Sequence, residues 1–105
     1  MSKKLVALCA CPMGLAHTFM AAEAIKKAAI EMGYEVKVET QGADGIQNEL
    51  TAADIKNADI ILHAIAVTPQ DMERFEGYEI YEVGLQEVIK NPKGVIQEIE
   101  EDLAQ

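Results

Sequence analysis

The residue types best suited to chemistry lie near the amino terminus, in the stretch ACPMGLAHT at residues 10–18. Cys11 follows an apolar run, Gly14 comes three residues later, and His17 and Thr18 precede an alanine-rich segment. A thiolate is a strong nucleophile, and a turn that leads into a helix presents backbone N–H groups to an anion. The stretch therefore predicts a cysteine nucleophile beside a cradle for a phosphate group.

The backbone of this stretch can supply the cradle. Gly14 permits backbone angles that other residues resist, whereas Pro12 stiffens the start of the loop and offers no N–H group. The donors must therefore come from the next six residues, which are Met13, Gly14, Leu15, Ala16, His17 and Thr18. A helix amino terminus lowers a thiol pKa from about 8.5 to between about 3.5 and 7.5. Cys11 could then attack a phosphorus atom without a general base, while the N–H groups hold the phosphate oxygens.

The spacing of Cys11, His17 and Thr18 resembles the Cys-x5-Arg-Ser/Thr loop of low-molecular-weight tyrosine phosphatases, with histidine in the arginine position. Arginine is always charged and grips phosphate with two parallel hydrogen bonds, whereas histidine offers one or two donors and titrates near neutral pH. A weaker grip suits a loop that passes its phosphoryl group on. A small cysteine phosphatase remains an alternative, although the missing arginine and the lack of a recognisable late aspartate motif argue against it.

Each of these residues also has a plain structural interpretation. Cys11 could be a buried thiol at the start of a loop, and His17 could cap the helix. Cys9 is expected inside a strand as a small core residue, and His63 is expected to be a satisfied histidine in the core or at a strand end. A metal pair of Cys9 and Cys11 would lack further ligands, because His17 and His63 are the only histidines. We therefore expect neither a metal nor a cofactor.

The elements that position this stretch alternate between strand and helix. Residues 3–10 are two lysines followed by a continuous apolar run, which is typical of a central parallel strand buried on both faces. A helix is expected at about residues 18–32, because alanine and isoleucine recur at helical spacing, and Gly33 can end it. Residues 34–40 predict a second strand nearer an edge, and residues 41–49 predict a turn-rich loop.

The same alternation continues in the middle of the chain. Residues 51–54 have the form of a capping box for a short helix that ends at about Asn57. Residues 58–67 are mostly apolar and predict a third strand. Residues 68–71 predict the start of another helix, which should end near Gly77.

The last part of the chain predicts a fourth strand at residues 78–83, a short helical turn at residues 85–89 and a final helix that Asn91 and Pro92 begin. That helix should turn four apolar side chains inward, those of Val95, Ile96, Ile99 and Leu103. Four short strands alternating with helices predict an α/β fold of three layers, α/β/α, around a parallel sheet. Ligands bind such sheets at the carboxyl ends of the strands, and Cys11 follows the first strand.

The composition bounds the function. The 105 residues are expected to form one domain, and 18 acidic against 9 basic residues give a net charge of −9. This charge argues against nucleic acid and against an anionic membrane surface. No apolar run approaches the roughly 20 residues needed to span a membrane, and no signal peptide is predicted, so we expect a cytosolic protein. The acidic carboxyl terminus predicts a solvated helix face or a surface for a basic partner.

Three stretches together resemble one protein family. They are ACPMGLAHTFMAAEAI at residues 10–25, VKVETQGADGIQNELTAADI at residues 36–55 and ERFEG at residues 73–77. In this order they are similar to the fructose-family enzyme IIB domains of the bacterial phosphoenolpyruvate-dependent sugar phosphotransferase system, above all to free-standing fructose-like IIB components. The resemblance covers nearly the whole chain, so residues 1–105 are expected to be a single IIB domain of type 2.

The resemblance implies a phosphoryl relay on a Rossmann-like fold whose four-stranded parallel sheet has the order 2-1-3-4. Phosphohistidine of a IIA component would pass its phosphoryl group to Cys11, which is the family's phosphocysteine before proline, and residues 13–18 would hold the phosphate. Cys11 would then donate the group to a sugar, fructose or fructose-like, bound by the membrane component IIC. The chain would thus be an enzyme, a protein-phosphocysteine–sugar phosphotransferase. It would be cytoplasmic and peripherally associated with its permease, without inserting into the membrane.

One departure from the family's pattern lies at HAIAVTPQD, residues 63–71. Many relatives have an acidic residue after the third strand, so His63 and Thr68 are expected to alter the surface beside the loop. This difference would affect the choice of partner or sugar and leave the cysteine chemistry unchanged. A binding or regulatory module without chemistry, which senses a partner through its helical surface, is a third interpretation.

Overall fold

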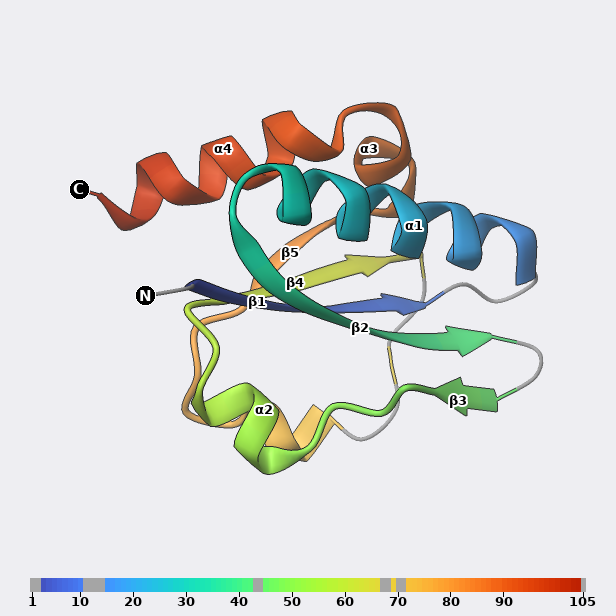
Figure 1. Ribbon diagram of the computed structural model, residues 1–105. Coiled ribbons are helices and arrows are strands. Elements are labelled where there is room, and N and C mark those ends of the chain that lie inside the picture. The colour runs from blue at the N-terminus through green and yellow to red at the C-terminus, as the bar shows by residue number, and fades with distance from the viewer. Residues whose placement is uncertain (1–2, 11–14, 43–44, 67–68, 70–71, 105) are drawn as a thin grey trace.

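The computed structural model describes residues 3–10, 15–42, 45–66, 69 and 72–104, with the backbone alone at residues 15–17. Its described strands form one sheet in the order β3-β2-β1-β4-β5 (Figure 1). The strand bounds are β1 Lys3–Ala10, β2 Tyr34–Gly42, β3 Gly45–Gln47, β4 Ile60–Ile65 and β5 Tyr81–Gly84. The four predicted strands are β1, β2, β4 and β5. They run parallel to one another in the order β2-β1-β4-β5, which confirms the predicted order 2-1-3-4, and β3 is a fifth strand.

The short strand β3 corrects the prediction for residues 41–49. These residues were expected to form a loop, but β3 pairs antiparallel with the end of β2, with Thr40 opposite Gln47 and Gly42 opposite Gly45. β2 is therefore not an edge strand. Gly45 has a φ of +91°, a conformation that glycine adopts at little cost, and β3 is too short to show a strand-like alternation in the sequence.

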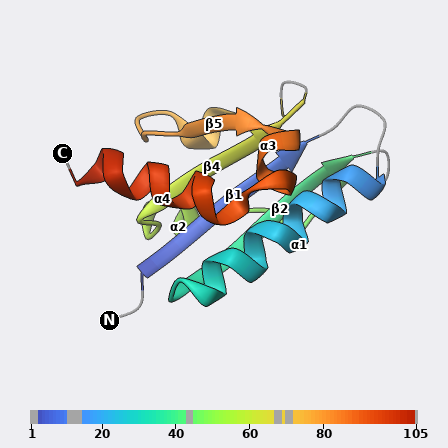
Figure 2. The ribbon, with the colours of Figure 1, turned by 90° about the horizontal axis from the view of Figure 1, so that it is seen from above.

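Helices cover both faces of the sheet, as the three-layer prediction requires (Figures 1 and 2). On one face lie α1 Leu15–Glu31, α3 Leu85–Lys90 and α4 Pro92–Leu103, and on the other lie α2 Ala52–Lys56 and the 3-10 helix η1 Met72–Phe75. Alternate side chains of β1 enter the two cores, because successive strand residues point to opposite faces. Leu5, Ala7 and Cys9 pack with the core under α1, α3 and α4, whereas Val6, Leu8 and Ala10 pack with the core near α2 and η1.

The helix ends agree with the capping residues in most places. Thr51 and Asp54 form the predicted capping box of α2, and the Asn91 side chain accepts a hydrogen bond from the Gly94 N–H at 3.2 Å at the start of α4. α1 begins three residues earlier than predicted, and Gly33, with a φ of +91°, follows its end.

Two predictions for the later helices need correction. The helix expected between residue 68 and Gly77 is, in its described part, the single 3-10 turn η1, and residues 68, 70 and 71 lie outside the described residues. The Leu103 side chain was expected to point inward but is 47% exposed, because it is the last residue of α4. Val95, Ile96 and Ile99 are buried as predicted.

Candidate functional site

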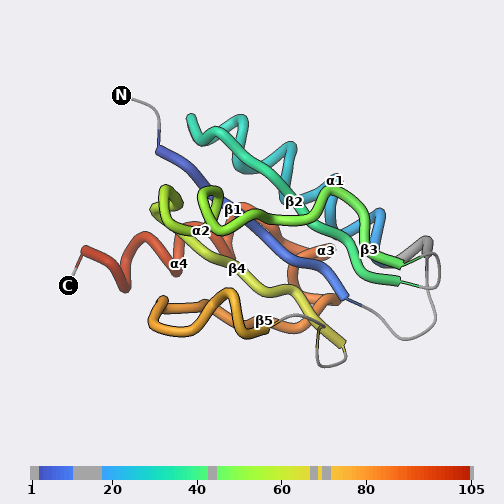
Figure 3. Tube along the Cα trace, turned by 90° about the horizontal axis from the view of Figure 1, so that it is seen from below, coloured from blue at the N-terminus to red at the C-terminus, as the bar shows by residue number. Residues whose placement is uncertain are grey.

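The carboxyl ends of the central strands meet at one edge of the sheet, seen from below in Figure 3. β1 ends at Ala10, and the Ala66 N–H, directly after β4, donates to the Ala10 carbonyl at 2.9 Å. α1 begins at Leu15, so residues 11–14 join the central strand to the amino terminus of this 17-residue helix. This edge is where ligands bind in open α/β sheets.

The side chains of most of the residues predicted to bind phosphate fall outside the described part of the structure. Cys11, Met13 and Gly14 are not described, and of Leu15, Ala16 and His17 only the helical backbone is. Their roles remain predictions. The backbone of residues 15–17 forms the first turn of α1, where N–H groups lack partners within the helix and a positive partial charge gathers.

Thr18 is the one predicted phosphate-binding residue whose side chain is described. It is only 2% exposed, and its Oγ1 has no hydrogen-bond partner within the described structure. A buried hydroxyl without a partner costs free energy, so such groups usually have a functional or ligand-related explanation. An anion at the amino end of α1 would supply an acceptor for this hydroxyl.

The buried polar side chains of the described chain gather towards the carboxyl edge. They are Thr18, Glu39, Thr40, Gln41 and His63. Three of them belong to the last four residues of β2, one lies two residues before the end of β4, and one lies in the first turns of α1. The buried side chains in the first halves of β1 and β4 are apolar. The sheet thus has one polar end, and it is the end at which Cys11 follows β1.

Cys9 is a core residue, as predicted. Its side chain is fully buried, and burial raises the pKa of the thiol to about 12. The charge of Lys26 opposes this shift but is the weaker effect. The raised pKa keeps the thiol protonated at neutral pH, and burial keeps it inaccessible. Cys9 is therefore unsuited to act as a nucleophile.

His63 is a core residue too, but the prediction that its polar atoms are satisfied is wrong within the described structure. The ring is fully buried, and neither nitrogen has a hydrogen-bond partner there. It meets the Phe75 ring edge to face, with 4.6 Å between centroids. Burial, and secondly the charge of Arg74, lower the pKa of His63 to about 4. The imidazole is therefore neutral at pH 7.

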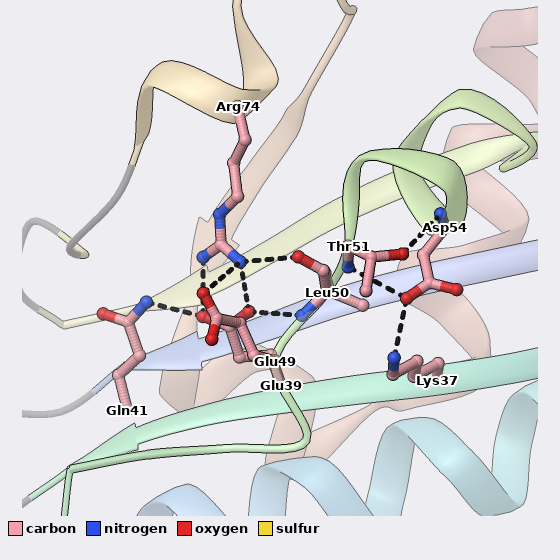
Figure 4. A network of polar contacts seen from close by, with 8 residues as sticks. All are labelled: Lys37, Glu39, Gln41, Glu49, Leu50, Thr51, Asp54 and Arg74. Atoms are coloured by element: carbon pink, nitrogen blue, oxygen red, sulfur yellow. Dashed lines mark hydrogen bonds and ion pairs between the residues drawn. The ribbon is translucent and has the colours of Figure 1, made fainter.

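Sequence reasoning missed a buried ion pair that joins β2 to η1 (Figure 4). Two nitrogens of Arg74 donate to the two carboxylate oxygens of Glu39 at 2.6 and 2.7 Å, and one of them also donates to the Leu50 carbonyl at 2.9 Å. The side-chain amide of Gln41 and the backbone N–H of Leu50 each donate to the same carboxylate at 2.7 Å. Burial raises the pKa of Glu39, but these hydrogen bonds outweigh it and hold the pKa below its ordinary value.

The sequence carried only an indirect signal for this pair. Glu39 and Arg74 belong to two of the three stretches that carried the family resemblance, but they are 35 positions apart. No periodic pattern links residues at that separation. Only the fold, by bringing η1 over the end of β2, shows that they pair.

Two kinds of feature are absent from the part of the chain that the structure describes. Within the described residues, no group of three or more histidine, cysteine, aspartate or glutamate side chains is placed to hold a metal ion. Over the same part of the chain, no helix combines the length and the apolar character that crossing a membrane requires.

Comparisons with a family model and with known proteins point to the same family. Residues 6–98 match the family model described as "PTS system, Lactose/Cellobiose specific IIB subunit". The chain is 69% identical over 104 residues to the "PTS system fructose-like EIIB component 1" of Escherichia coli (strain K12), and the match covers 99% of this chain and 96% of the relative.

Solved structures agree in both fold and sequence. The solution structure of an enzyme IIB subunit of the PTS system from Escherichia coli K12 has a TM-score of 0.93 and 69% identity, over 99% of this chain and 96% of that one. The crystal structure of a domain from a fructose-specific IIABC component of Borrelia burgdorferi has a TM-score of 0.88 and 43% identity, over 93% of each chain.

Proposed function

The chain belongs to the IIB family of the bacterial sugar phosphotransferase system, in its fructose-like type, and we propose that Cys11 is the residue that carries its phosphoryl group. In this proposal residues 1–105 act as one IIB domain. A IIA component phosphorylated on histidine is the donor, and a sugar held by a membrane IIC component is the acceptor. The protein works in the cytoplasm at the surface of that permease.

The first transfer exchanges a phosphorus–nitrogen bond for a phosphorus–sulfur bond. The Cys11 thiolate attacks the phosphorus of phosphohistidine in line, and the donor imidazole leaves with the electron pair of the broken bond. The N–H groups of residues 13–18 hold the three peripheral oxygens, and the Thr18 hydroxyl donates to one of them. The positive end of α1 lowers the pKa of the Cys11 thiol, so the thiolate is present at neutral pH.

The second transfer restores the free thiolate. A sugar hydroxyl attacks the phosphorus of phosphocysteine, the phosphorus–sulfur bond breaks, and the hydroxyl proton is released as the sugar phosphate forms. His17 occupies the position at which a phosphatase loop has arginine, and we propose that it binds the phosphoryl group more weakly than arginine would. One relative is a fructose-like component and another belongs to a fructose-specific component, which favours a fructose-like sugar as the acceptor.

The observation that best supports this proposal is the position of Cys11 in the chain. It directly follows β1, the central strand, and three residues separate it from Leu15, where α1 begins. Cys9, the other cysteine, is buried and has a raised pKa, which leaves Cys11 as the available thiol. The unpartnered Thr18 hydroxyl adds support from the described part of the site.

Label transfer from a phosphorylated IIA component tests the proposal. The unchanged protein should take up one labelled phosphoryl group, because the thiolate is a good nucleophile towards phosphohistidine. Cys11→Ser should take up none, whereas Cys9→Ser should be labelled like the unchanged protein. Label that survives in Cys11→Ser and disappears in Cys9→Ser would show that the assignment is wrong.

A further inference from the structure

We infer that the buried Glu39–Arg74 ion pair positions the phosphoryl-transfer site through Gln41 at the end of β2. The inference rests on the proposed function of Cys11 and goes beyond it, because it assigns a role in the reaction to residues on β2 and η1, outside the loop. Arg74 and Glu39 act in it as positioning residues, since neither needs to touch the phosphoryl group.

The first step is the completeness of the network around Glu39. Its carboxylate is fully buried and accepts four hydrogen bonds, two from Arg74, one from the Gln41 amide and one from the Leu50 N–H. Arg74 closes the ring by donating to the Leu50 carbonyl. A guanidinium and a carboxylate matched by two parallel bonds fix both distance and orientation. This network thus holds together three parts of the chain: the end of β2, η1 and the segment before α2.

The second step is the place of this network in the sheet. Glu39 is in register with Leu8, and Gln41 is in register with Ala10, the residue that precedes Cys11. An ionised carboxylate only accepts hydrogen bonds, so the Gln41 amide must turn its NH2 group towards Glu39. The ion pair therefore sets the orientation of a buried amide, only 7% exposed, beside the end of the central strand.

The third step is energetic. Buried ion pairs are often no more stabilising than apolar residues of similar volume, because both charges lose their hydration. A contribution to stability therefore does not by itself explain why the Glu39–Arg74 pair lies at the polar end of the sheet. A second ion pair on β2, between Lys37 and Asp54 at 2.6 Å, is partly exposed, with side chains 41% and 30% accessible. It lies nearer the amino end, with Lys37 in register with Val6.

The consequence is a rate effect that can be separated from stability. In-line transfer depends on the placement of the reacting groups, and misplacement by about 1 Å can reduce a rate about a hundredfold. Loosening the end of β2 beside Ala10 should disturb the backbone dipoles around Cys11. The thiol pKa should then rise, and phosphoryl transfer should slow.

The experiment compares Arg74→Met, Glu39→Gln and the double variant Glu39→Gln/Arg74→Met. Arg74→Met leaves the buried Glu39 carboxylate without its counter-ion, and Glu39→Gln removes the buried counter-ion of Arg74, whose contact with the exposed Glu49 at 3.9 Å is longer. Both changes should lower the urea midpoint, whereas the double change removes both members of the buried pair and should recover much of that loss. The rate of phosphoryl uptake in the double variant should nevertheless stay roughly tenfold or more below that of the unchanged protein. The rate of Cys11 alkylation by iodoacetamide, measured against pH, should rise at a higher pH in the double variant than in the unchanged protein.

The matched control is Lys37→Met, which removes an ion pair from the same strand and should leave the alkylation profile unchanged. Arg74→Lys gives a second test, because it keeps the charge, loses the two-pronged contact and should still shift the profile. Recovery of both the midpoint and the alkylation profile in the double variant, or an unshifted profile in Arg74→Lys, would overturn the inference. Phosphoryl labelling of the unchanged protein tests the proposed function separately, because alkylation reports on the network whether or not that label appears.

Discussion

At the scale of single residues, His63 makes folding sensitive to acid. The ring is buried without a hydrogen-bond partner among the described residues, and its pKa of about 4 lies below the ordinary value of 6.5. The unfolded chain therefore binds a proton more readily than the folded chain between these two values. The free energy of unfolding is therefore unaffected by His63 above pH 6.5. As the pH falls from 6.5 to 4, protonation of His63 in the unfolded chain lowers that free energy by about 3 kcal/mol in total.

Replacing His63 with leucine tests this dependence. His63→Leu should lose about 3 kcal/mol less free energy of unfolding than the unchanged protein between pH 6.5 and 4, because it has no imidazole to protonate. Urea unfolding at several pH values measures the difference, and the carboxylates common to both proteins cancel in the comparison. Parallel pH curves for the two proteins would contradict the prediction.

Thr18 offers a second test at this scale, one that separates stability from function. Its hydroxyl is buried and has no partner in the part of the chain that the structure describes, so Thr18→Val should be as stable as the unchanged protein or more stable by about 1 kcal/mol. Phosphoryl uptake should slow, because an oxygen of the phosphoryl group loses its hydrogen bond. Urea unfolding and label transfer on the same preparation give both values. A large loss of stability would indicate that the hydroxyl has a structural partner instead.

At the scale of elements, α4 depends on its amino-terminal cap. Asn91 accepts a hydrogen bond from the Gly94 N–H, and Pro92 occupies the first turn. Asn91→Ala should cost about 1 kcal/mol in the free energy of unfolding, whereas Asn91→Asp should keep most of it, since a carboxylate can also accept this bond. Thermal unfolding measures the difference. Equal losses in both variants would show that the cap bond contributes little.

The sequence predicted those elements whose signals are local. The buried run of β1, the Ala-rich stripe of α1 and the caps at Thr51 and Asn91 each lie within one stretch of chain, and all appear in the structure. β3 could not be predicted, because three residues show no periodicity and its pairing depends on the turn at Gly45. The Glu39–Arg74 pair could not be predicted either, because it depends on how distant elements pack.

At the scale of the whole molecule, the two ends of the sheet differ in chemistry. At the amino end, tyrosine hydroxyls anchor the acidic helix α4, since Tyr34 donates to Glu100 and Tyr81 donates to Asp102 at 2.9 Å. At the carboxyl end lie the buried polar groups and the start of α1. The amino end thus secures the last helix of the fold, and the carboxyl end presents the groups that suit an anion.

The measurement that tests the central claim most directly is mass spectrometry of the protein after incubation with a phosphorylated IIA component. Fragmentation between Cys9 and Cys11 should place the added phosphoryl mass on Cys11, because Cys9 is buried with a raised pKa. Brief addition of the IIC component and its sugar should then remove that mass and yield the sugar phosphate. A phosphoryl group found on Cys9 or on a histidine, or one on Cys11 that the sugar never removes, would contradict the account.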